Sequence, residues 1–595
     1  MVMRFSALIY ATAKSLRSDG LMRTLNKIVT RILRILIRIK RQLSRPYRLS
    51  RGERKRQSSF VFPKDITFSI LVPLYNTPKT YLAELIASVK NQTYARWELC
   101  LSNGSDEAHN YVEFLCRQTA AADSRIVYRR LEYNRGISEN TNCCIEMSSG
   151  DYLGLLDHDD LLHPAALFEV MKAICGQSAD FIYTDESTFK RKPKDAYCPN
   201  YKPDYAPDTL RSQNYICHFT VFARTLIDKV GMFRRCFDGS QDYDMVLRLT
   251  EAAGKIVHIP KVLYYWRASE SSVAADVSVK VYALEAARAA LAEHLERVGL
   301  KGVIDDSRVP STYRVRYKIQ GDPLISILIP NKDHVDDLKK CIGSILCLTT
   351  HRNYEIVIVE NGSKETRTFA FYEQLRQNEN IRIEVWSDQF NFSAINNFGF
   401  QYTRGDYVVL LNNDIVVITP DWLQEMLMFA QRPDVGAVGA MLYYPDDTIQ
   451  HAGVIVGLGG VAGHAHKNLK RGEVGFMYRA AIAQNLSAVT AACMMVPRHV
   501  YEEIGGLDEE FEVAFNDVDM CMRIRKTGYL VVFTPYAELY HCESKSRGQE
   551  NTSAKRKRFE SEVLRFKDRW AEELEVGDPY YNPNLTLNAE DFTVR

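Results

Sequence analysis

A cluster of aspartates follows an apolar stretch in the first half of the chain. The sequence GDYLGLLDHDDLLHP covers residues 150–164, and Asp157, Asp159 and Asp160 come directly after its apolar residues. Each carboxylate raises the free energy needed to ionise its neighbours, so three of them at the end of a buried strand require a cation nearby. The motif therefore predicts a cationic ligand at this point.

Two halves of the chain repeat the same blocks in the same order. The matching pairs are residues 68–105 with 325–363, 149–164 with 404–420, and 239–249 with 514–524. A repeat at a separation of about 255–275 residues indicates tandem domains rather than a solenoid.

Each half has the pattern of an α/β domain. Apolar, β-branched segments alternate with amphipathic helical segments, which predicts a largely parallel sheet covered on both faces. In such sheets ligands bind beyond the carboxyl ends of the strands. The polar residues at these ends are Asn103, Asp157, Asp159, Asn361 and Asp414.

The length of 595 residues requires more than one core. We expect a basic arm over residues 1–60, domains over 65–300 and 322–570, a linker over 301–321 and a tail over 571–595.

The basic arm predicts binding to an anionic membrane surface. Residues 1–60 carry a net charge of +14, which leaves −12 for the rest because the whole chain is +2. Over residues 21–48 the arginines fall on one face of a helix and aliphatic residues on the other, as in helices that lie in a membrane interface. Packing of the arm on the acidic body is an alternative. Nucleic-acid binding would not need so wide an aliphatic face, so no nucleic-acid partner is expected.

The remaining composition favours a cytoplasmic protein at a membrane surface. The sequence has no secretory signal pattern and no uncharged apolar run of about 18–20 residues. Its 13 cysteines include no C-x-x-C pair, which favours a reducing compartment.

Several motifs resemble those of a known family. LLDHDDLLHP, RSQNYICH, FNFSAINNFGF and LYHCESKSRG are similar to motifs of the inverting, nucleotide-sugar-dependent glycosyltransferases of family 2. The resemblance covers residues 65–290 and 322–560 and is strongest to bacterial O-antigen and capsule enzymes, rhamnosyltransferases among them. It implies two GT-A domains, after the amphipathic helix, on the inner face of the cytoplasmic membrane.

The resemblance implies a set of nucleotide-sugar-binding residues. In the first half these are Pro73, Tyr75, Asn103, Asn134 and Asp157. In the second half they are Pro330, Glu360, Asn361, Asn397 and Arg547.

The resemblance also implies Mg²⁺ or Mn²⁺ as cofactor. The ligands would be Asp157 and Asp159 in the first half, and Asp414 and His541 in the second. The halves differ, since Tyr265 is expected at the place of His541 and Asn412 replaces the first aspartate of the second motif.

The catalytic bases implied by the family are Asp242 and Asp517, each at the start of a predicted helix. One such carboxylate would take the proton of the acceptor hydroxyl. Either aspartate could instead serve as a helix N-cap. Asp244 and Asp519 are expected to support the loop.

We therefore expect a glycosyltransferase that acts on a lipid-linked polysaccharide, using nucleotide-diphosphate sugars as donors. One active domain with a degenerate acceptor-binding partner is an alternative, and a non-catalytic glycan-binding scaffold is another.

Overall fold

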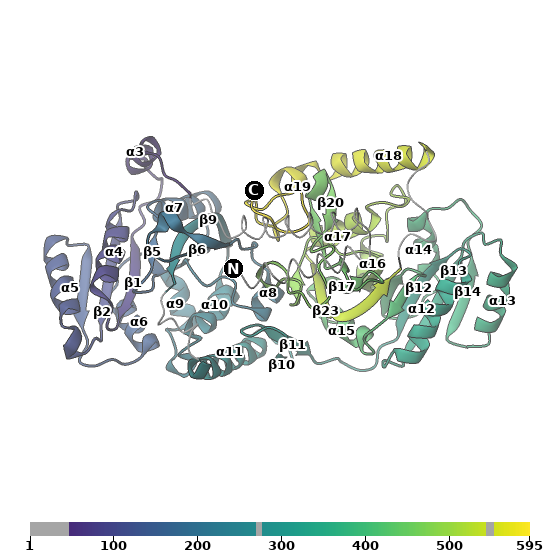
Figure 1. Ribbon diagram of the computed structural model, residues 1–595, viewed down its shortest axis with the longest axis horizontal. Coiled ribbons are helices and arrows are strands. Elements are labelled where there is room, and N and C mark those ends of the chain that lie inside the picture. The colour runs from purple at the N-terminus through teal and green to yellow at the C-terminus, as the bar shows by residue number, and fades with distance from the viewer. Residues whose placement is uncertain (1–46, 269–276, 543–552) are drawn as a thin grey trace, which may run out of the picture.

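The computed structural model describes residues 47–268, 277–542 and 553–595 (Figure 1). The predicted amphipathic helix lies within residues 21–48, almost wholly outside these ranges. Within them, no helix is both long and apolar enough to cross a membrane. The first described helix is α3 (Arg51–Ser59), which Figure 1 shows at the edge of the first half.

The first half contains a mixed sheet. In spatial order its strands are β3 (Ile126–Arg130), β2 (Trp97–Asn103), β1 (Phe68–Leu74), β4 (Tyr152–Leu155), β8 (Thr220–Ala223), β6 (Phe181–Phe189), β9 (Ile256–Arg267) and β5 (Leu161–Leu162), with β7 (Tyr197–Asn200) beside β6. β3, β2, β1 and β4 are parallel, whereas β8 is antiparallel to both of its neighbours. The expected sheet is thus present, with a reversed strand at its centre.

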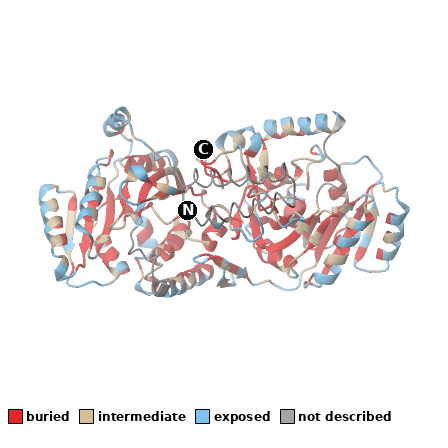
Figure 2. Cartoon of the chain, viewed as in Figure 1, coloured by how far each residue is buried: buried red, intermediate tan, exposed pale blue. Residues whose placement is uncertain are grey.

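Helices cover this sheet on both faces. They are α4 (Lys79–Lys90), α5 (Tyr111–Ala122), α6 (Ile137–Glu146), α7 (Ala166–Gln177), α8 (Pro207–Ser212), α9 (Arg224–Val230), α10 (Gln241–Ala252) and α11 (Val277–Arg297). Two apolar clusters form the core, one on each face of the strands, and Figure 2 shows the strands as the buried centre.

The second half repeats this order strand for strand. Its sheet runs β14 (Ile381–Val385), β13 (Tyr354–Glu360), β12 (Ile325–Asn331), β15 (Tyr407–Leu411), β22 (Cys493–Pro497), β17 (Val435–Tyr443), β23 (Leu530–His541) and β16 (Ile415–Val417), with β18 (Ile449–His451) and β21 (Gln484–Asn485) at its side. β19 (Val454–Val456) and β20 (Ala462–His464) form a separate hairpin. Its helices are α12 (Val335–Leu348), α13 (Thr366–Leu375), α14 (Phe392–Phe400), α15 (Trp422–Ala430), α16 (Arg498–Glu503), α17 (Asn516–Lys526), α18 (Ser553–Arg569) and α19 (Ala571–Val576).

Individual hydrogen bonds also recur in both halves. The backbone N–H of Gly150 donates to Ser69 Oγ at 2.9 Å, and that of Gly405 donates to Ser326 Oγ at 2.8 Å. A Cβ on Gly150 would lie 2.6 Å from Ser69 Oγ, closer than side-chain carbons approach. The hydrogen bond that joins β1 to the residues before β4, and β12 to those before β15, therefore requires glycine.

The two halves meet at a buried polar cluster. Residues 301–321, the predicted linker, contain the hairpin β10 (Gly302–Asp306) and β11 (Tyr313–Tyr317). Beside it, the buried carboxylate of Asp208 in α8 forms an ion pair with Arg432 of the second half and accepts a hydrogen bond from Asn485 Nδ2 at 2.8 Å. This cluster joins the halves through buried charges.

The C-terminal residues also join the halves. Residues 577–595, within the predicted tail, follow α19, and Figure 1 places the C-terminus between the two halves. One apolar cluster combines Tyr581, Leu585, Phe592 and Val594 with Leu161 and Tyr265 of the first half and Ile455 and Leu458 of the second. We call residues 577–595 the C-terminal strap.

Candidate functional site

The aspartate motif of the first half turns away from the end of β4. Asp157 and Asp159 are partly exposed, whereas Asp160 is buried. Asp160 accepts hydrogen bonds at 2.6 Å from the Tyr264 hydroxyl and from the backbone N–H of Arg267. Asp160 therefore holds the loop against β9, and two carboxylates remain for a ligand.

Asp242 lies within electrostatic reach of this motif. It occupies the first turn of α10, whose N-cap is Ser240, so Asp242 is not the cap residue. Burial, followed by the negative charge of Asp157, raises the pKa of Asp242 from 3.8 to about 6, while His218 opposes the rise. A carboxyl group with this pKa is suited to accept a proton near neutral pH.

His218, a residue that the sequence did not single out, lies beside Asp157. Its Nε2 is 3.7 Å from Asp157 Oδ2, and its ring stacks on Tyr264 at 4.8 Å with an interplanar angle of 13°. Burial lowers the pKa of His218, but Cys217 and Asp157 outweigh burial, so the pKa lies well above 6.5. His218 is the last residue of the RSQNYICH motif, so the resemblance of that motif was the signal that could have found it.

The second half places His541 against Asp414. His541 Nδ1 lies 2.7 Å from Gln450 Oε1, an acceptor, so the ring proton belongs on Nδ1. Nε2 then presents a lone pair to Asp414 Oδ1 at 3.2 Å, and Asn412 Nδ2 is also 3.2 Å away. A carboxylate and a neutral imidazole nitrogen that face each other are a suitable donor pair for a divalent cation.

Asp517 lies one loop away from the second motif. Its Oδ2 accepts a hydrogen bond from the backbone N–H of Ala491 at 3.1 Å, and the next residue, Ala492, accepts one from the backbone N–H of Asn412 at 3.1 Å. Asp517 is in the first turn of α17, whose N-cap is Phe515. The implied base and the motif are thus adjacent in this half too.

The two neighbouring aspartates support the structure, as expected. Asp244 is fully buried and forms an ion pair with Arg248 at 2.7 Å. Asp519 is likewise buried and accepts from Arg523 Nε at 2.8 Å. Both fix the helix that carries the implied base.

The residue that corresponds to His541 in the first half is Trp266. Asp159 and Asp414 are equivalent positions of the two motifs. From them, the pairing of β5 with β9 and of β16 with β23 places Trp266 at the position of His541. The expected counterpart, Tyr265, is one residue earlier and is buried in the strap cluster. The expectation was wrong by one position, since Trp266 and His541 both come six residues after a proline of their strand, Pro260 in β9 and Pro535 in β23.

Apart from Asp157, the implied nucleotide residues of the first half cluster at the ends of β1 and β2. Pro73 lies in β1, and Tyr75 beyond it has 46% of its surface exposed. Asn103 is buried, donates to the Tyr128 hydroxyl at 3.1 Å and accepts from the Ser105 N–H at 2.9 Å. Asn134 is exposed and lies over the same turn, since a Cβ on Gly104 would be 3.1 Å from its Cα. Tyr75 and Asn134 are the accessible members.

In the second half most of the implied nucleotide residues serve the fold. Pro330 lies in β12. Glu360 is buried and accepts hydrogen bonds from Ser363 Oγ at 2.7 Å and the Tyr372 hydroxyl at 2.5 Å. Asn361 is buried as well, and its backbone N–H donates to Asn331. Glu360 thus stabilises the turn that follows β13.

Asn397 fastens α14 to a loop. Its amide exchanges hydrogen bonds with the backbone of Leu507 at 2.8 and 3.0 Å and accepts from the Tyr501 hydroxyl at 2.8 Å. Asn142 makes the same pair with Phe233 in the first half, at 2.9 Å each way. These bonds indicate a structural role for Asn397. Arg547 lies outside the described residues.

Among the described residues, no group of three or more His, Cys, Asp or Glu side chains is arranged to hold a metal ion. The metal-binding residues implied for each half are two side chains rather than three. A cation held by few protein ligands commonly completes its coordination shell with substrate oxygens and water. The donor chemistry of Asp157 and Asp159, and of Asp414 with His541, fits Mg²⁺ or Mn²⁺.

Comparison with known families shows to which family the chain belongs. The profile of Glycosyl transferase family 2 matches residues 69–231 and 326–505, one region in each half. The chain belongs to glycosyl transferase family 2. The two sheets, each with a reversed strand at its centre, are accordingly the two GT-A domains that the resemblance implied.

Relatives of this family 2 chain include two long proteins. An uncharacterized protein of Sinorhizobium fredii is 46% identical over 88% of the chain and 58% of its own length. An O-antigen biosynthesis protein of Myxococcus xanthus is 36% identical over 89% of the chain and 41% of its own length. The chain thus spans about half the length of these relatives.

Shorter and more distant similarities exist as well. An N-acetylglucosaminyl-diphospho-decaprenol L-rhamnosyltransferase of Mycobacterium tuberculosis is 25% identical over 39% of the chain and 79% of its own length. Among solved structures, a mannosyltransferase from Pyrobaculum calidifontis in complex with GDP-Man and Mn²⁺ superposes on 42% of the chain and 65% of its own length, with a TM-score of 0.32 and 14% identity.

Proposed function

We propose that the chain is an inverting glycosyltransferase with two modules, over residues 65–300 and 322–570. Each would transfer a sugar from a nucleotide-diphosphate sugar to a growing, lipid-linked cell-surface polysaccharide. Family membership and relatives whose names include O-antigen biosynthesis and a diphospho-decaprenol rhamnosyltransferase support this function.

One observation carries the proposal. In both halves a carboxylate motif at the end of the fourth strand lies next to a second aspartate at the start of a helix. In the first half the charge of Asp157 shifts the pKa of Asp242, and in the second Asp517 and Asn412 bond to adjacent residues of one loop. A transferase of this kind needs a diphosphate site and a base within one site.

The chain's own groups would perform the proton transfer. A carboxylate oxygen of Asp242 or Asp517 accepts the proton of the acceptor hydroxyl while the hydroxyl oxygen of the acceptor attacks the anomeric carbon. Attack occurs opposite the diphosphate, so the bond to the diphosphate breaks as the new bond forms and the configuration inverts. Asp157 and Asp159, or Asp414 and His541, would hold a divalent cation, which when bound neutralises charge on the leaving diphosphate.

The accessible side chains suit the donor. The exposed ring of Tyr75 can stack on a nucleobase, and the amide of Asn134 can hydrogen-bond to it. At the corresponding edge of the second half, Pro330 lies near the end of β12 and Asn361 directly follows β13. The second module would therefore bind its donor with fewer exposed side chains.

We propose peripheral binding to the inner face of the cytoplasmic membrane through the N-terminal arm. The described part of the arm supports this placement, because Arg51, Arg54, Lys55 and Arg56 of α3 are exposed. Phe60 and Val61, with 56% and 87% of their surfaces exposed, follow directly. Flotation with anionic liposomes should require residues 1–60; equal flotation without them would contradict the placement.

The test of function begins with a panel of nucleotide sugars, to identify the donors that the protein consumes with an acceptor. Asp242→Asn and Asp517→Asn should then each abolish a different glycosidic linkage, as seen by mass spectrometry and NMR of the products. Identical products from both variants would refute the two-module assignment. Full retention of both linkages in each variant would refute the bases.

A further inference from the structure

The two modules each have one histidine at the motif, but on different strands. His541 ends β23, where the first module has Trp266. His218 precedes β8, and the register of β8 and β22 against β4 and β15 aligns it with Ala492. Each module therefore lacks the histidine that the other has.

The side chain of His218 is held in one orientation. Its ring stacks on Tyr264, whose hydroxyl donates to the buried carboxylate of Asp160 and accepts from the backbone N–H of Asp157 at 3.3 Å. Nε2 lies 3.7 Å from Asp157 Oδ2, and the side chains of His218 and Asp157 keep 14% and 41% of their surfaces exposed. The pair therefore meets at the surface of the site.

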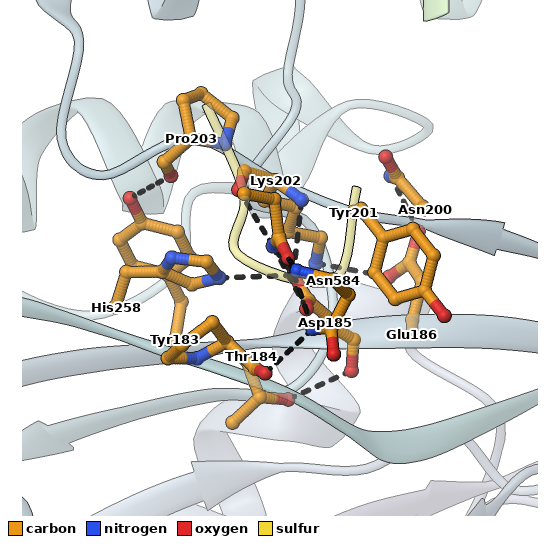
Figure 3. A network of polar contacts seen from close by, with 12 residues as sticks. Tyr183, Thr184, Asp185, Glu186, Asn200, Tyr201, Lys202, Pro203, His258 and Asn584 are labelled. Atoms are coloured by element: carbon orange, nitrogen blue, oxygen red, sulfur yellow. Dashed lines mark hydrogen bonds and ion pairs between the residues drawn. The ribbon is translucent and has the colours of Figure 1, made fainter. Parts of the chain in front are cut away.

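The backbone of His218 is held from the inside. The ammonium group of Lys202 is fully buried, donates to Ile216 O at 2.6 Å and also contacts His218 O. Glu186 pairs with Lys202 at 3.2 Å and accepts from the His218 N–H at 3.3 Å. Figure 3 shows Lys202, Glu186 and Asp185 within one network of polar contacts. Buried charges of this kind are expensive to maintain, and here they fix the segment that presents His218.

We propose that His218 releases its ring proton when the metal binds and supplies, in the first module, the imidazole ligand of the divalent cation that His541 supplies in the second. The inference rests on the proposed function, since it assigns the cation of the same donor site. Two ligand atoms with bonds of about 2.1 Å can share one cation when they lie up to about 4.2 Å apart. The separation of 3.7 Å satisfies this limit, as does the 3.2 Å between His541 and Asp414.

A magnetic-resonance experiment on the full chain tests the assignment. Mn²⁺ is added to the Asp414→Asn/His541→Ala double variant, and electron spin echo modulation detects imidazole nitrogen bound to the metal. We expect nitrogen coupling in this variant, where His218 is intact, and loss of the coupling when His218→Ala is added. The affinity for Mn²⁺ should fall about 10-fold or more with the same change.

His158→Ala in the same background is the matched control. His158 lies in the motif itself and its Nδ1 contacts Thr77 Oγ1 at 2.9 Å. Because His218 is intact in this variant, the nitrogen coupling should persist. Bound Mn²⁺ without nitrogen coupling in the double variant would overturn the assignment, and so would the absence of Mn²⁺ binding. Neither result depends on whether His218→Ala folds.

Donor consumption in the same preparations separates the two proposals. Consumption by the double variant without nitrogen coupling overturns the His218 assignment and leaves the function in place. Failure of the wild-type chain to consume any donor in the panel overturns the proposed function.

Discussion

The side-chain amide of Asn582 donates hydrogen bonds to the carboxylate of Asp185, at 2.9 and 3.1 Å, although the two residues are 397 positions apart. Asp185 is fully buried in β6 and also faces His258 Nε2 at 2.9 Å. The C-terminal strap therefore completes the hydrogen bonding of a buried carboxylate. The next residue in the chain, Glu186, accepts a hydrogen bond from the backbone N–H of His218.

Loss of this contact should weaken the first module. Asn582→Ala leaves part of the Asp185 carboxylate without donors, and we expect the free energy of unfolding to fall by about 1–3 kcal/mol. Hydrogen exchange should show faster exchange in β6 than in the strands of the second sheet. Asn588→Ala changes an exposed strap residue and should have little effect. Equal protection of β6 in both variants would contradict the role of the strap.

The raised pKa of Asp242 predicts a pH dependence of the first linkage. A base works only when ionised, so the rate of that transfer should rise as the pH increases through about 6. The rate is measured in the Asp517→Asn variant, where the first module acts alone. A rate that is already maximal at pH 5 would contradict the assignment.

The same shift predicts an effect on stability. Because the folded chain holds a proton on Asp242 that the unfolded chain releases near pH 3.8, stability should decrease as the pH rises from about 4 to 6. Asp242→Asn should remove this part of the pH dependence of thermal unfolding. An unchanged pH profile in the variant would show that another group is responsible.

The sequence predicted the features that local patterns encode. The repeat of blocks predicted two like domains, and the short spacing to Arg248 and Arg523 agrees with the supporting roles of Asp244 and Asp519. Asp157 and Asp414 each follow the fourth strand of their own half, β4 and β15, as the strand pattern predicted.

Features that depend on distant partners could not be read from the sequence. Asp160 looks like a third ligand of the motif, yet it is buried by Tyr264, more than 100 residues away. Glu360 accepts a hydrogen bond from the Tyr372 hydroxyl, twelve residues later in the chain. His218 lies beside Asp157 only because β8 runs antiparallel to β4. Burial of such groups is decided by tertiary contacts, to which single-sequence patterns are blind.

The pair of Asp208 and Arg432 should dominate the joint between the halves. Burial raises the pKa of Asp208, but Arg432 and Arg211 outweigh it and hold the pKa well below 3.8. Asp208→Ala leaves the buried Arg211 without its carboxylate partner and Arg432 with only the partly exposed Asp434, and should cost about 3–5 kcal/mol in thermal or denaturant unfolding. The wild-type contribution should be present above pH 3.8 and lost as the pH falls through the lowered pKa.

Asp305 offers the control for that measurement. It pairs with Arg316 on the β10–β11 hairpin, where both side chains are well exposed. Exposed pairs contribute about 0–1 kcal/mol, so Asp305→Ala should be nearly neutral. Similar losses in the two variants would show that burial of the Asp208 pair does not hold the halves together.

Gly150 should tolerate no side chain. In Gly150→Ala the new carbon would lie 2.6 Å from Ser69 Oγ and 2.7 Å from the carbonyl oxygen of Thr67. Backbone atoms cannot move aside cheaply, so we expect a loss of about 1–3 kcal/mol in the free energy of unfolding. Gly176→Ala is the control, because a Cβ there meets no described atom within 4 Å and Gly176 lies in α7, where alanine favours the helix. If Gly150→Ala were as stable as Gly176→Ala, β1 and β4 would have to separate at this bond, and amide exchange at Gly150 would reveal it.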